Sequence, residues 1–222
     1  MKKNGQTTLQ GTFTMKIDTK VSEIYSILDG LSEPEIIFLE FENSFQLLIG
    51  VILSAQTTDK QVNQVLPDLF RKFPDPQALG AAELQDVINI IRPVGFFNVK
   101  ARNIIKTAAA VHENHSDEIP ESMDELLKLT GVGRKSANVI RGACFNLPAI
   151  IVDTHFARTV TRLGLTIEKT PDRIELDLIQ SIPSEIQYRF SMLLNKLGRE
   201  FCHSRKPDCS NCPLKGLCRW KT

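Results

Sequence analysis

The sequence predicts an all-α protein, and three observations support this fold class. Apolar residues recur at three- and four-residue spacing in nearly every periodic segment. Alternating apolar and polar patterns, which are typical of strands, are absent. At 222 residues, 42% of them hydrophobic, the chain is long enough to bury a substantial core. We therefore expect a bundle of helices joined by short loops.

The first three predicted helices have distinct sequence patterns. One covers about residues 21–31. The next covers 45–53, which is apolar on almost all sides and should therefore lie inside the bundle. The third has an apolar stripe over 62–73, and the Thr-Asp pair at 58–59 suits its N-terminal cap.

Three further helices are predicted in the middle of the chain. One stripe covers 84–91 and stops before a proline, and another covers 101–111 and is opened by Asn98. Ser122 and Glu125 then have the spacing of a capping box, in which each side chain accepts a hydrogen bond from the other's backbone N–H.

Four more helices complete the prediction. One covers 135–145, and Asp153 can cap the next, over 156–163. The Thr-Pro pair at 170–171 opens another, because proline favours the first helical position. The last long stripe covers 186–197, and the cysteine-rich tail after it lacks helical periodicity.

Charge alone neither requires nor excludes a nucleic-acid partner, because the formal net charge is +1. Acidic residues gather in 18–42, whereas basic residues gather near 92–106, 134–141 and 199–221. This segregation fits either scattered solvated faces or one surface that contacts phosphates.

No targeting or membrane segment is visible. Residues 1–14 are polar and lack the apolar centre of a secretory signal. The longest apolar run, over 45–53, is too short to cross a bilayer. We therefore expect a cytoplasmic protein with no membrane partner, whose thiols stay reduced.

Four of the five cysteines, Cys202, Cys209, Cys212 and Cys218, fall in one segment with the spacing C-x6-C-x2-C-x5-C. A reduced compartment disfavours disulfides between them. Four thiolates suit structural zinc, although zinc ribbons usually have two close C-x-x-C pairs and this segment has one. Four thiolates in one compact loop also suit a 4Fe–4S cluster. The fifth, Cys144, has the position of a core residue.

Two cations, Arg205 and Lys206, lie in the loop between the first two of these cysteines. If the cysteines bind a metal group, this loop would be fixed and both cations could be held toward DNA phosphates. The alternative is that they are two solvated cations on a surface loop.

The segment LTGVGRK at 129–135 joins two predicted helices. Gly131 and Gly133, on either side of Val132, allow a tight turn with positive φ. They also leave backbone N–H groups free at the start of the next helix, and such a site can bind a phosphate oxygen. Arg134 adds a cation there. Without further motifs, the same glycine pair is often only a helix C-cap.

Five segments occur in one order along about 45–220. They are LSAQTTD at 53–59, VGFFNVKA at 94–101, LTGVGRKSANV at 129–139, IVDTH at 151–155 and the cysteine tail. In this order and with these gaps they resemble the endonuclease III family of helix–hairpin–helix DNA glycosylase/AP lyases.

The resemblance implies two helical lobes around a DNA-facing cleft. Residues 38–149 would form a helical barrel domain with the helix–hairpin–helix motif, and 1–37 with 150–222 would form the second domain. The tail cysteines would hold a 4Fe–4S cluster in a C-terminal loop. The partner would be double-stranded DNA with a damaged base or an abasic site, bound by a monomer, which would be nucleoid-associated if bacterial.

The resemblance also implies a catalytic pair. Lys135 matches the lysine that attacks C1′, displaces the base and forms a Schiff base before β-elimination cleaves the strand 3′ to the abasic site. Asp153 matches the carboxylate that stabilises positive charge on the sugar. A free lysine has a pKa of about 10.4, so Lys135 would need burial, cations such as Arg134, or a helix N-terminus to lower it. The alternatives are a surface lysine and a simple helix cap.

Two residues match the family's DNA-inserting positions. Gln56 corresponds to the residue that enters the duplex at the vacated position. Phe96 stands where the family usually has a leucine wedge, and although a phenyl ring can also insert between bases, Phe96 could instead be a core residue. Lys100 and Arg102, close to this wedge, are expected to contact phosphates.

Ser54, Asp59 and His155 align with the family's base pocket, although His155 could equally cap a helix. The family suggests oxidised pyrimidines as substrates. Adenine-specific relatives with the same cluster, and relatives that act on thymine or uracil opposite guanine, generally lack a lysine at the position of Lys135. That lysine therefore favours a bifunctional lyase. A non-catalytic DNA-binding scaffold with a structural metal is the remaining alternative.

Overall fold

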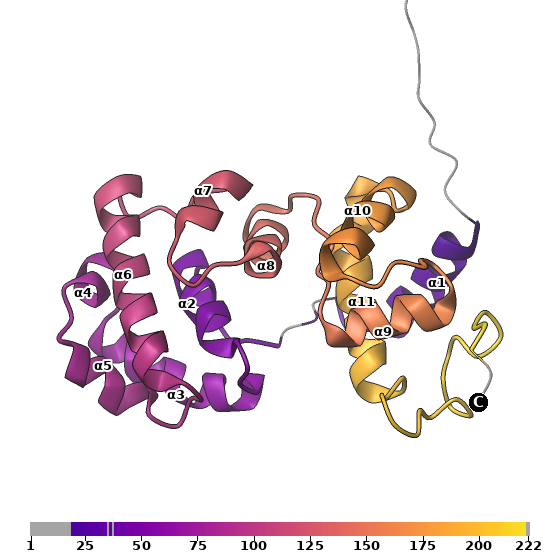
Figure 1. The fold of residues 1–222 in the computed structure, drawn as a ribbon, viewed down its shortest axis with the longest axis horizontal. Helices are drawn as coiled ribbons and strands as arrows, with labels where there is room; N and C mark the ends of the chain where they lie inside the picture. The colour runs from indigo at the N-terminus through magenta and orange to yellow at the C-terminus, as the bar shows by residue number, and fades with distance from the viewer. Residues whose placement is uncertain (1–18, 35, 37, 221–222) are drawn as a thin grey trace, which may run out of the picture.

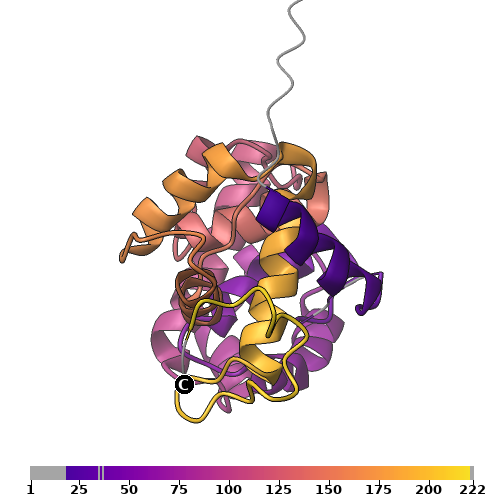
Figure 2. The same cartoon turned by 90° about the vertical axis from the view of Figure 1, so that its right-hand side faces the viewer.

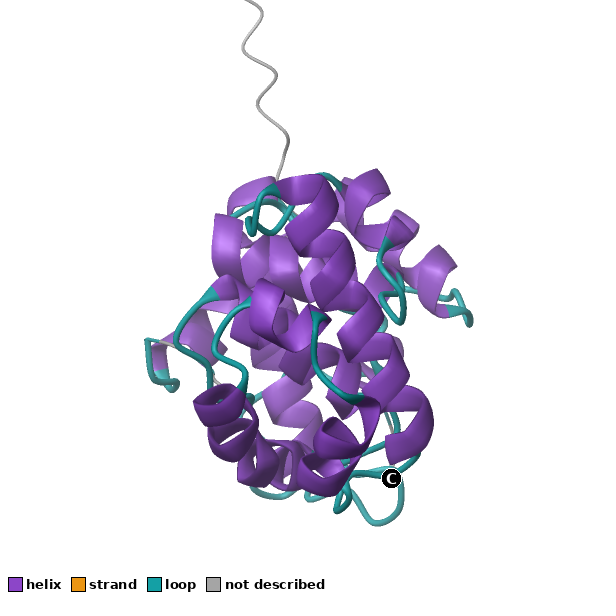
Figure 3. Ribbon diagram, turned by 90° about the vertical axis from the view of Figure 1, so that its left-hand side faces the viewer, coloured by secondary structure: helices purple, strands orange, loops and turns teal. Residues whose placement is uncertain are grey.

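The computed structural model describes residues 19–34, 36 and 38–220, and all regular structure in these ranges is helical (Figures 1 and 3). Residues 1–18, 35, 37 and 221–222 lie outside the described residues, and they include the polar stretch 1–14 and the acidic Glu35. The helices are α1 (Thr19–Gly30), α2 (Ser44–Ser54), α3 (Asp59–Lys72), α4 (Pro76–Gly80), α5 (Leu84–Ile91), α6 (Phe97–His115), α7 (Met123–Lys128), α8 (Arg134–Phe145), α9 (Thr154–Leu163), α10 (Pro171–Ser181), the short 3₁₀ helix η1 (Ser184–Ile186) and α11 (Gln187–Glu200). The predicted all-α class is confirmed.

Two lobes follow one another along the long axis of the molecule, each with its own apolar core (Figure 1). Helices α2–α8 form the first lobe, whose buried core residues lie between Leu39 and Ile140. Helices α1 and α9–α11 form the second lobe together with the cysteine tail. Figure 2 shows α1 beside α11, with the tail looping over this lobe. The chain therefore passes between the lobes twice, before α2 and after α8.

Helix α2 runs through the core of the first lobe, as its apolar sequence predicts. Leu48, Ile49 and Leu53 are completely buried, and the helix packs against α3, α6 and α8. No helix in the described part of the chain is long and apolar enough to cross a membrane. The all-round apolar segment is therefore a core helix.

Several predicted helix ends are confirmed. The Thr58 hydroxyl caps α3 by accepting the Gln61 N–H at 3.3 Å. Asp153 caps α9 by accepting the Phe156 N–H at 2.7 Å, and Gly164 ends that helix with φ 70°. These side chains satisfy backbone N–H groups that a helix leaves unpaired at its start.

Two predicted helix starts are wrong in detail. Helix α6 begins one residue before Asn98, because Phe96 is its cap residue and has a left-handed backbone with φ 59°. Ser122 is the cap residue of α7 but makes no side-chain cap hydrogen bond, while Glu125 accepts from Lys128 Nζ at 2.6 Å. The capping box is therefore not formed. The prediction also lacks α4 and η1, because five and three residues are too few to show a periodic stripe.

Candidate active site

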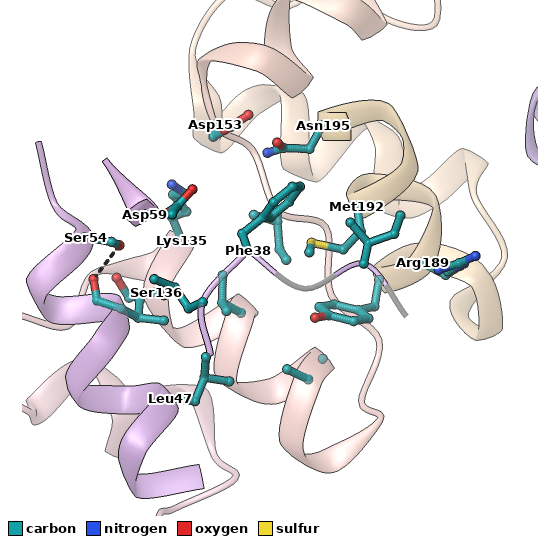
Figure 4. A pocket seen from close by; sticks show the side chains of 18 of the residues that line it. Phe38, Leu47, Ser54, Asp59, Lys135, Ser136, Asp153, Arg189, Met192 and Asn195 are labelled. Carbon is teal, nitrogen blue, oxygen red and sulfur yellow. Dashed lines mark hydrogen bonds between the residues drawn. The ribbon is translucent and has the colours of Figure 1, made fainter. Parts of the chain in front are cut away.

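A cleft of about 900 Å³ lies between the lobes, and both predicted catalytic residues line it. Lys135 and Asp59 reach it from the first lobe, and Asp153 and Asn195 reach it from the second (Figure 4). Gln56, in the loop after α2, lines it as well. The fold thus gathers the start of α8, the cap of α9 and one side of α11 around a single space.

Lys135 is the second residue of α8, and its side chain is exposed at the cleft. Within the described residues its amine forms no hydrogen bond or ion pair, so the protein leaves it available to a ligand. The structure places Lys135 at a helix N-terminus, which is one of the conditions predicted for this lysine. The Lys135 side chain is not buried in the free protein, so that condition is absent.

Arg134, the cation expected beside Lys135, has its guanidinium already paired within the protein. Its Nε and Nη2 donate to the two carboxylate oxygens of Glu175 on α10 at 2.7 and 2.8 Å. The Glu175 side chain is 6% exposed, and its hydrogen bonds raise the pKa of the guanidinium. Asn138 Nδ2 donates to the same carboxylate and to the Ile150 carbonyl. The Arg134 side chain therefore joins the lobes, and its charge is paired with Glu175 and not left unpaired beside Lys135. Its contact with DNA stays a prediction.

The helix–hairpin–helix motif consists of α7, the turn at 129–133 and α8. Gly131 has φ 83°, and a side chain there would also crowd Asn103 and Ile52. Gly133 has φ −100°, so the predicted positive φ is correct for Gly131 and wrong for Gly133. Val132 is buried and anchors the turn in the first core. No side chain caps α8, so its first N–H groups can meet an anion.

Asp153 is a helix cap and a cleft residue at once. Its Oδ1 accepts the Phe156 N–H, which fixes the orientation of the carboxylate. Its Oδ2 has no hydrogen-bond partner within the described residues. Asp153 is therefore a helix cap, as the alternative predicted, and its second carboxylate oxygen remains available at the cleft.

Two of the three predicted base-pocket residues, Ser54 and Asp59, line the cleft. Ser54 Oγ donates to the Val51 carbonyl at 2.9 Å. Asp59 accepts from Arg199 Nη1 on α11 at 2.7 Å, and the Arg199 guanidinium lies 4.0 Å from the centre of the Phe38 ring. The sequence analysis missed Arg199 as a cleft residue, because its sequence neighbours suggest only a basic group beside the tail.

The third, His155, does not line the cleft. It lies where α9 crosses α11, and a side-chain carbon at Gly198 would stand 2.9 Å from the His155 Cβ. Its Nδ1 is 3.2 Å from Arg158 Nη2. The structure therefore places His155 in helix packing and does not bring it together with the other predicted base-pocket residues.

The two predicted insertion residues are both on the surface. Gln56 is exposed and Phe96 is 66% exposed, so the alternative that Phe96 belongs to the core is wrong. Arg102 is also exposed, as a phosphate contact requires. Lys100 is different: it is 5% exposed and its amine donates to two acceptors inside the protein. The prediction that Lys100 contacts phosphate is therefore wrong.

The four tail cysteines line one small cavity of about 60 Å³ in the second lobe. Arg162 Nη1 donates to the Cys202 sulfur at 3.2 Å, and the Arg162 guanidinium stacks on Trp220 at 4.7 Å. Among the described residues, no three His, Cys, Asp or Glu side chains meet closely enough to hold one metal ion. The four thiols nevertheless surround one space, and four thiolates suit either structural zinc or an iron–sulfur cluster.

The other cysteine and the loop cations have simple surroundings. Cys144 is partly buried and packs against the first core, as predicted, and burial raises the pKa of its thiol to about 11. Arg205 and Lys206 are exposed, and neither lines the cleft. Their contact with DNA stays a prediction.

Two helical lobes, a hairpin that suits phosphate, and a lysine and an aspartate on the intervening cleft define a helix–hairpin–helix DNA repair enzyme. The family model for the HhH-GPD superfamily of base excision DNA repair proteins matches residues 49–184. Endonuclease III of Synechocystis sp. is 42% identical over 200 residues, which cover 90% of this chain and 91% of the relative. The chain therefore belongs to the endonuclease III family within that superfamily.

Solved structures agree with this assignment. A non-covalent endonuclease III–DNA complex matches with a TM-score of 0.83 at 38% identity, covering 91% of this chain and 96% of that chain. A trapped endonuclease III–DNA covalent intermediate matches with a TM-score of 0.82 at 38% identity, covering 90% and 92%. As a member of this family, the protein is a DNA glycosylase and AP lyase of base excision repair, as predicted.

Proposed function

We propose that the protein removes damaged bases, in particular oxidised pyrimidines, from double-stranded DNA and cleaves the strand 3′ to the abasic site, with Lys135 as nucleophile. The observation that carries this proposal is that Lys135 and Asp153 come from different lobes and line one cleft. The protein acts as a cytoplasmic monomer. Its domains are 38–149 and 1–37 with 150–222, a division supported by the two separate apolar cores.

Base release begins when deprotonated Lys135 Nζ attacks C1′ of the extruded nucleotide. A C–N bond forms to Nζ, the bond to the base breaks, and the base leaves with the bonding electrons and takes up a proton. Positive charge develops on the sugar during this step, and the ionised Asp153 carboxylate stabilises it. Because Oδ1 is already fixed by the α9 backbone, the carboxylate needs little rearrangement.

Strand cleavage follows from the same covalent linkage. The nitrogen gives up a proton, the C1′–O4′ bond breaks as the C=N bond forms, and O4′ takes up a proton, which leaves a Schiff base between Nζ and C1′. A proton then leaves C2′, the C3′–O bond breaks, and the 3′ phosphate departs with the bonding electrons. Hydrolysis of the imine by water returns the free amine of Lys135.

The protein holds the DNA backbone without reading the base sequence. The free N–H groups at the start of α8, presented by the turn around Gly131, donate hydrogen bonds to a phosphate oxygen. The exposed cations Arg205 and Lys206 contact phosphates further along the duplex. Gln56 and Phe96 enter the stack where the damaged nucleotide has left it.

The four cysteines Cys202, Cys209, Cys212 and Cys218 hold a 4Fe–4S cluster, which when bound supplies four thiolate–iron bonds that tie the tail together. Within 201–220 only Leu214 is buried, so apolar burial contributes little to holding this segment. The cluster's part in this proposal is structural.

Protein purified without air is expected to show a visible sulfur-to-iron absorption band and about four iron atoms per chain. Cys212→Ala should lose both and lower Tm, because one of the four ligands is gone. Cys144→Ala is the matched control and should keep the band and the iron. Bound zinc with no visible band would contradict the cluster assignment.

Borohydride should trap a covalent adduct between the protein and a duplex with an abasic site, because it reduces a Schiff base to a stable amine. The adduct is measured as a shifted band on a denaturing gel. An undamaged duplex of the same sequence is the control and should give none. A monofunctional glycosylase or a DNA-binding scaffold does not trap, so the absence of an adduct would refute the proposed lyase mechanism.

A further inference from the structure

Lys100, on α6, is a buried cation with no part in the chemistry proposed above. Its amine donates to the Leu53 carbonyl at 2.8 Å and to the Thr57 hydroxyl at 2.7 Å, 47 and 43 positions earlier in the chain. Lysine is almost never fully buried unless it is paired. The Leu53 carbonyl belongs to the last turn of α2, where carbonyls lack helical partners. The lysine therefore fastens the end of α2 and the loop after it to α6.

Two insertion loops meet at this lysine. The first insertion loop, residues 55–58, carries Gln56, and the second, residues 92–96, carries Phe96. A side-chain carbon at Gly95 would lie 3.4 Å from Thr57 Oγ1 and 3.6 Å from the Gln56 carbonyl oxygen, so the loops lie against each other. The backbone N–H of Lys100 donates to the Phe96 carbonyl at 3.1 Å. One residue thus bonds to the second loop through its backbone and to the first through its amine.

Both insertion residues have an uncommon backbone conformation. Gln56 has φ 54° and Phe96 has φ 59°, in the left-handed region that residues other than glycine rarely adopt. Such conformations persist only where the surrounding structure fixes them strongly. The two hydrogen bonds from the Lys100 amine, at Leu53 and Thr57, hold the chain on both sides of Gln56.

We propose that Lys100 is a positioning residue that fixes the two insertion loops as one rigid unit, so that Gln56 and Phe96 enter the duplex together. This inference rests on the proposed roles of Gln56 and Phe96. Because Lys100 is buried, it acts through these loops without touching DNA. Rigid, preformed loops lose less conformational entropy on binding, which strengthens the complex.

The test compares Lys100→Met with Lys106→Met in the full-length protein with its cluster. Methionine keeps the apolar stem and removes the amine, and Lys106 is an exposed lysine on the same helix. Both variants lose one positive charge, so Lys106→Met measures what the loss of a charge alone does to DNA affinity. The probe is a duplex with 2-aminopurine opposite a tetrahydrofuran abasic analogue, because its fluorescence rises when the base is unstacked.

Lys106→Met should have the same duplex affinity and the same fluorescence plateau as the unsubstituted protein. Lys100→Met should bind this duplex at least about tenfold more weakly, since hydrogen bonds to a charged group are lost. At saturating protein it should also reach a lower fluorescence plateau, because the inserted residues no longer hold one position. Thr57→Val removes one acceptor with little change of shape and should move both readings in the same direction.

Unchanged affinity and plateau in Lys100→Met would overturn the inference. A lower Tm with an unchanged plateau would also overturn it, because that result describes a purely structural lysine. If Lys100→Met does not fold, Thr57→Val decides between the same outcomes. No fluorescence rise with the unsubstituted protein would refute the insertion roles and this inference together. Borohydride trapping tests the lyase proposal independently of all these readings.

Discussion

Lys135→Gln abolishes strand cleavage at abasic sites, with a loss of at least about a thousandfold expected. Glutamine has no nucleophilic amine, so neither the Schiff base nor the elimination that follows from it can form. The Lys135 side chain is exposed and forms no bond within the described residues, so its replacement should leave the fold intact. Cleavage is measured on a denaturing gel with a duplex that has one abasic site.

A DNA-binding measurement shows whether Lys135→Gln loses only the cleavage reaction or also the ability to bind DNA. Lys135→Gln should keep its affinity for a tetrahydrofuran duplex within about threefold, since one of several contacts that position the DNA changes. Lys106→Gln, on the exposed side of α6, is the control and should cleave normally. If Lys135→Gln still cleaves abasic DNA, another amine is the nucleophile and the assignment fails.

The helices could be predicted because their signals are local. An apolar stripe of three- and four-residue spacing needs only the neighbouring residues, and so does a cap such as Thr58 or Asp153. The tight turn of the hairpin was predictable for the same reason, since its glycine pair is a local signal and Gly131 has positive φ. The lobes could be expected only through the family resemblance.

The failures share a physical cause, which is that the deciding partner is distant in sequence. Arg134 and Lys100 each lie beside a DNA-binding motif, and both were expected to influence or contact the DNA site. Arg134 is held by Glu175, 41 positions later, and Lys100 by the Leu53 carbonyl, 47 positions earlier. The spacing of apolar residues along the sequence does not reveal such long-range pairs. Lys100 is buried, whereas Arg134 is 41% exposed, and for both the fold provides the partner from inside the protein.

The cleft is the least predictable feature because it exists only where the lobes meet. Arg199 reaches Asp59 across it, from α11 to the start of α3, and no local pattern joins these helices. His155 shows the reverse case, since its motif neighbour Asp153 faces the cleft while His155 packs between helices. Neighbours in a motif therefore need not share a site. The individual catalytic roles stay predictions that substitution must test.

Asp153→Asn is expected to slow base release at least about a hundredfold while barely changing stability. Asparagine caps a helix about as well as aspartate, so its side-chain oxygen can keep the hydrogen bond from the Phe156 N–H. The loss is therefore the negative charge that stabilises the developing positive charge on the sugar. Single-turnover release of an oxidised pyrimidine from a duplex, at saturating protein, measures the effect.

Asp75→Asn is the matched control, because Asp75 caps α4 in the same way and does not line the cleft. Its Oδ1 accepts the Ala78 N–H at 2.8 Å. The two variants should melt alike, and Asp75→Asn should release bases at the unsubstituted rate. At a preformed abasic site no base has to leave, so Asp153→Asn should trap with borohydride far better than it releases bases. Unchanged base release would reduce Asp153 to a helix cap, whereas an equal loss in both assays would indicate a displaced Lys135.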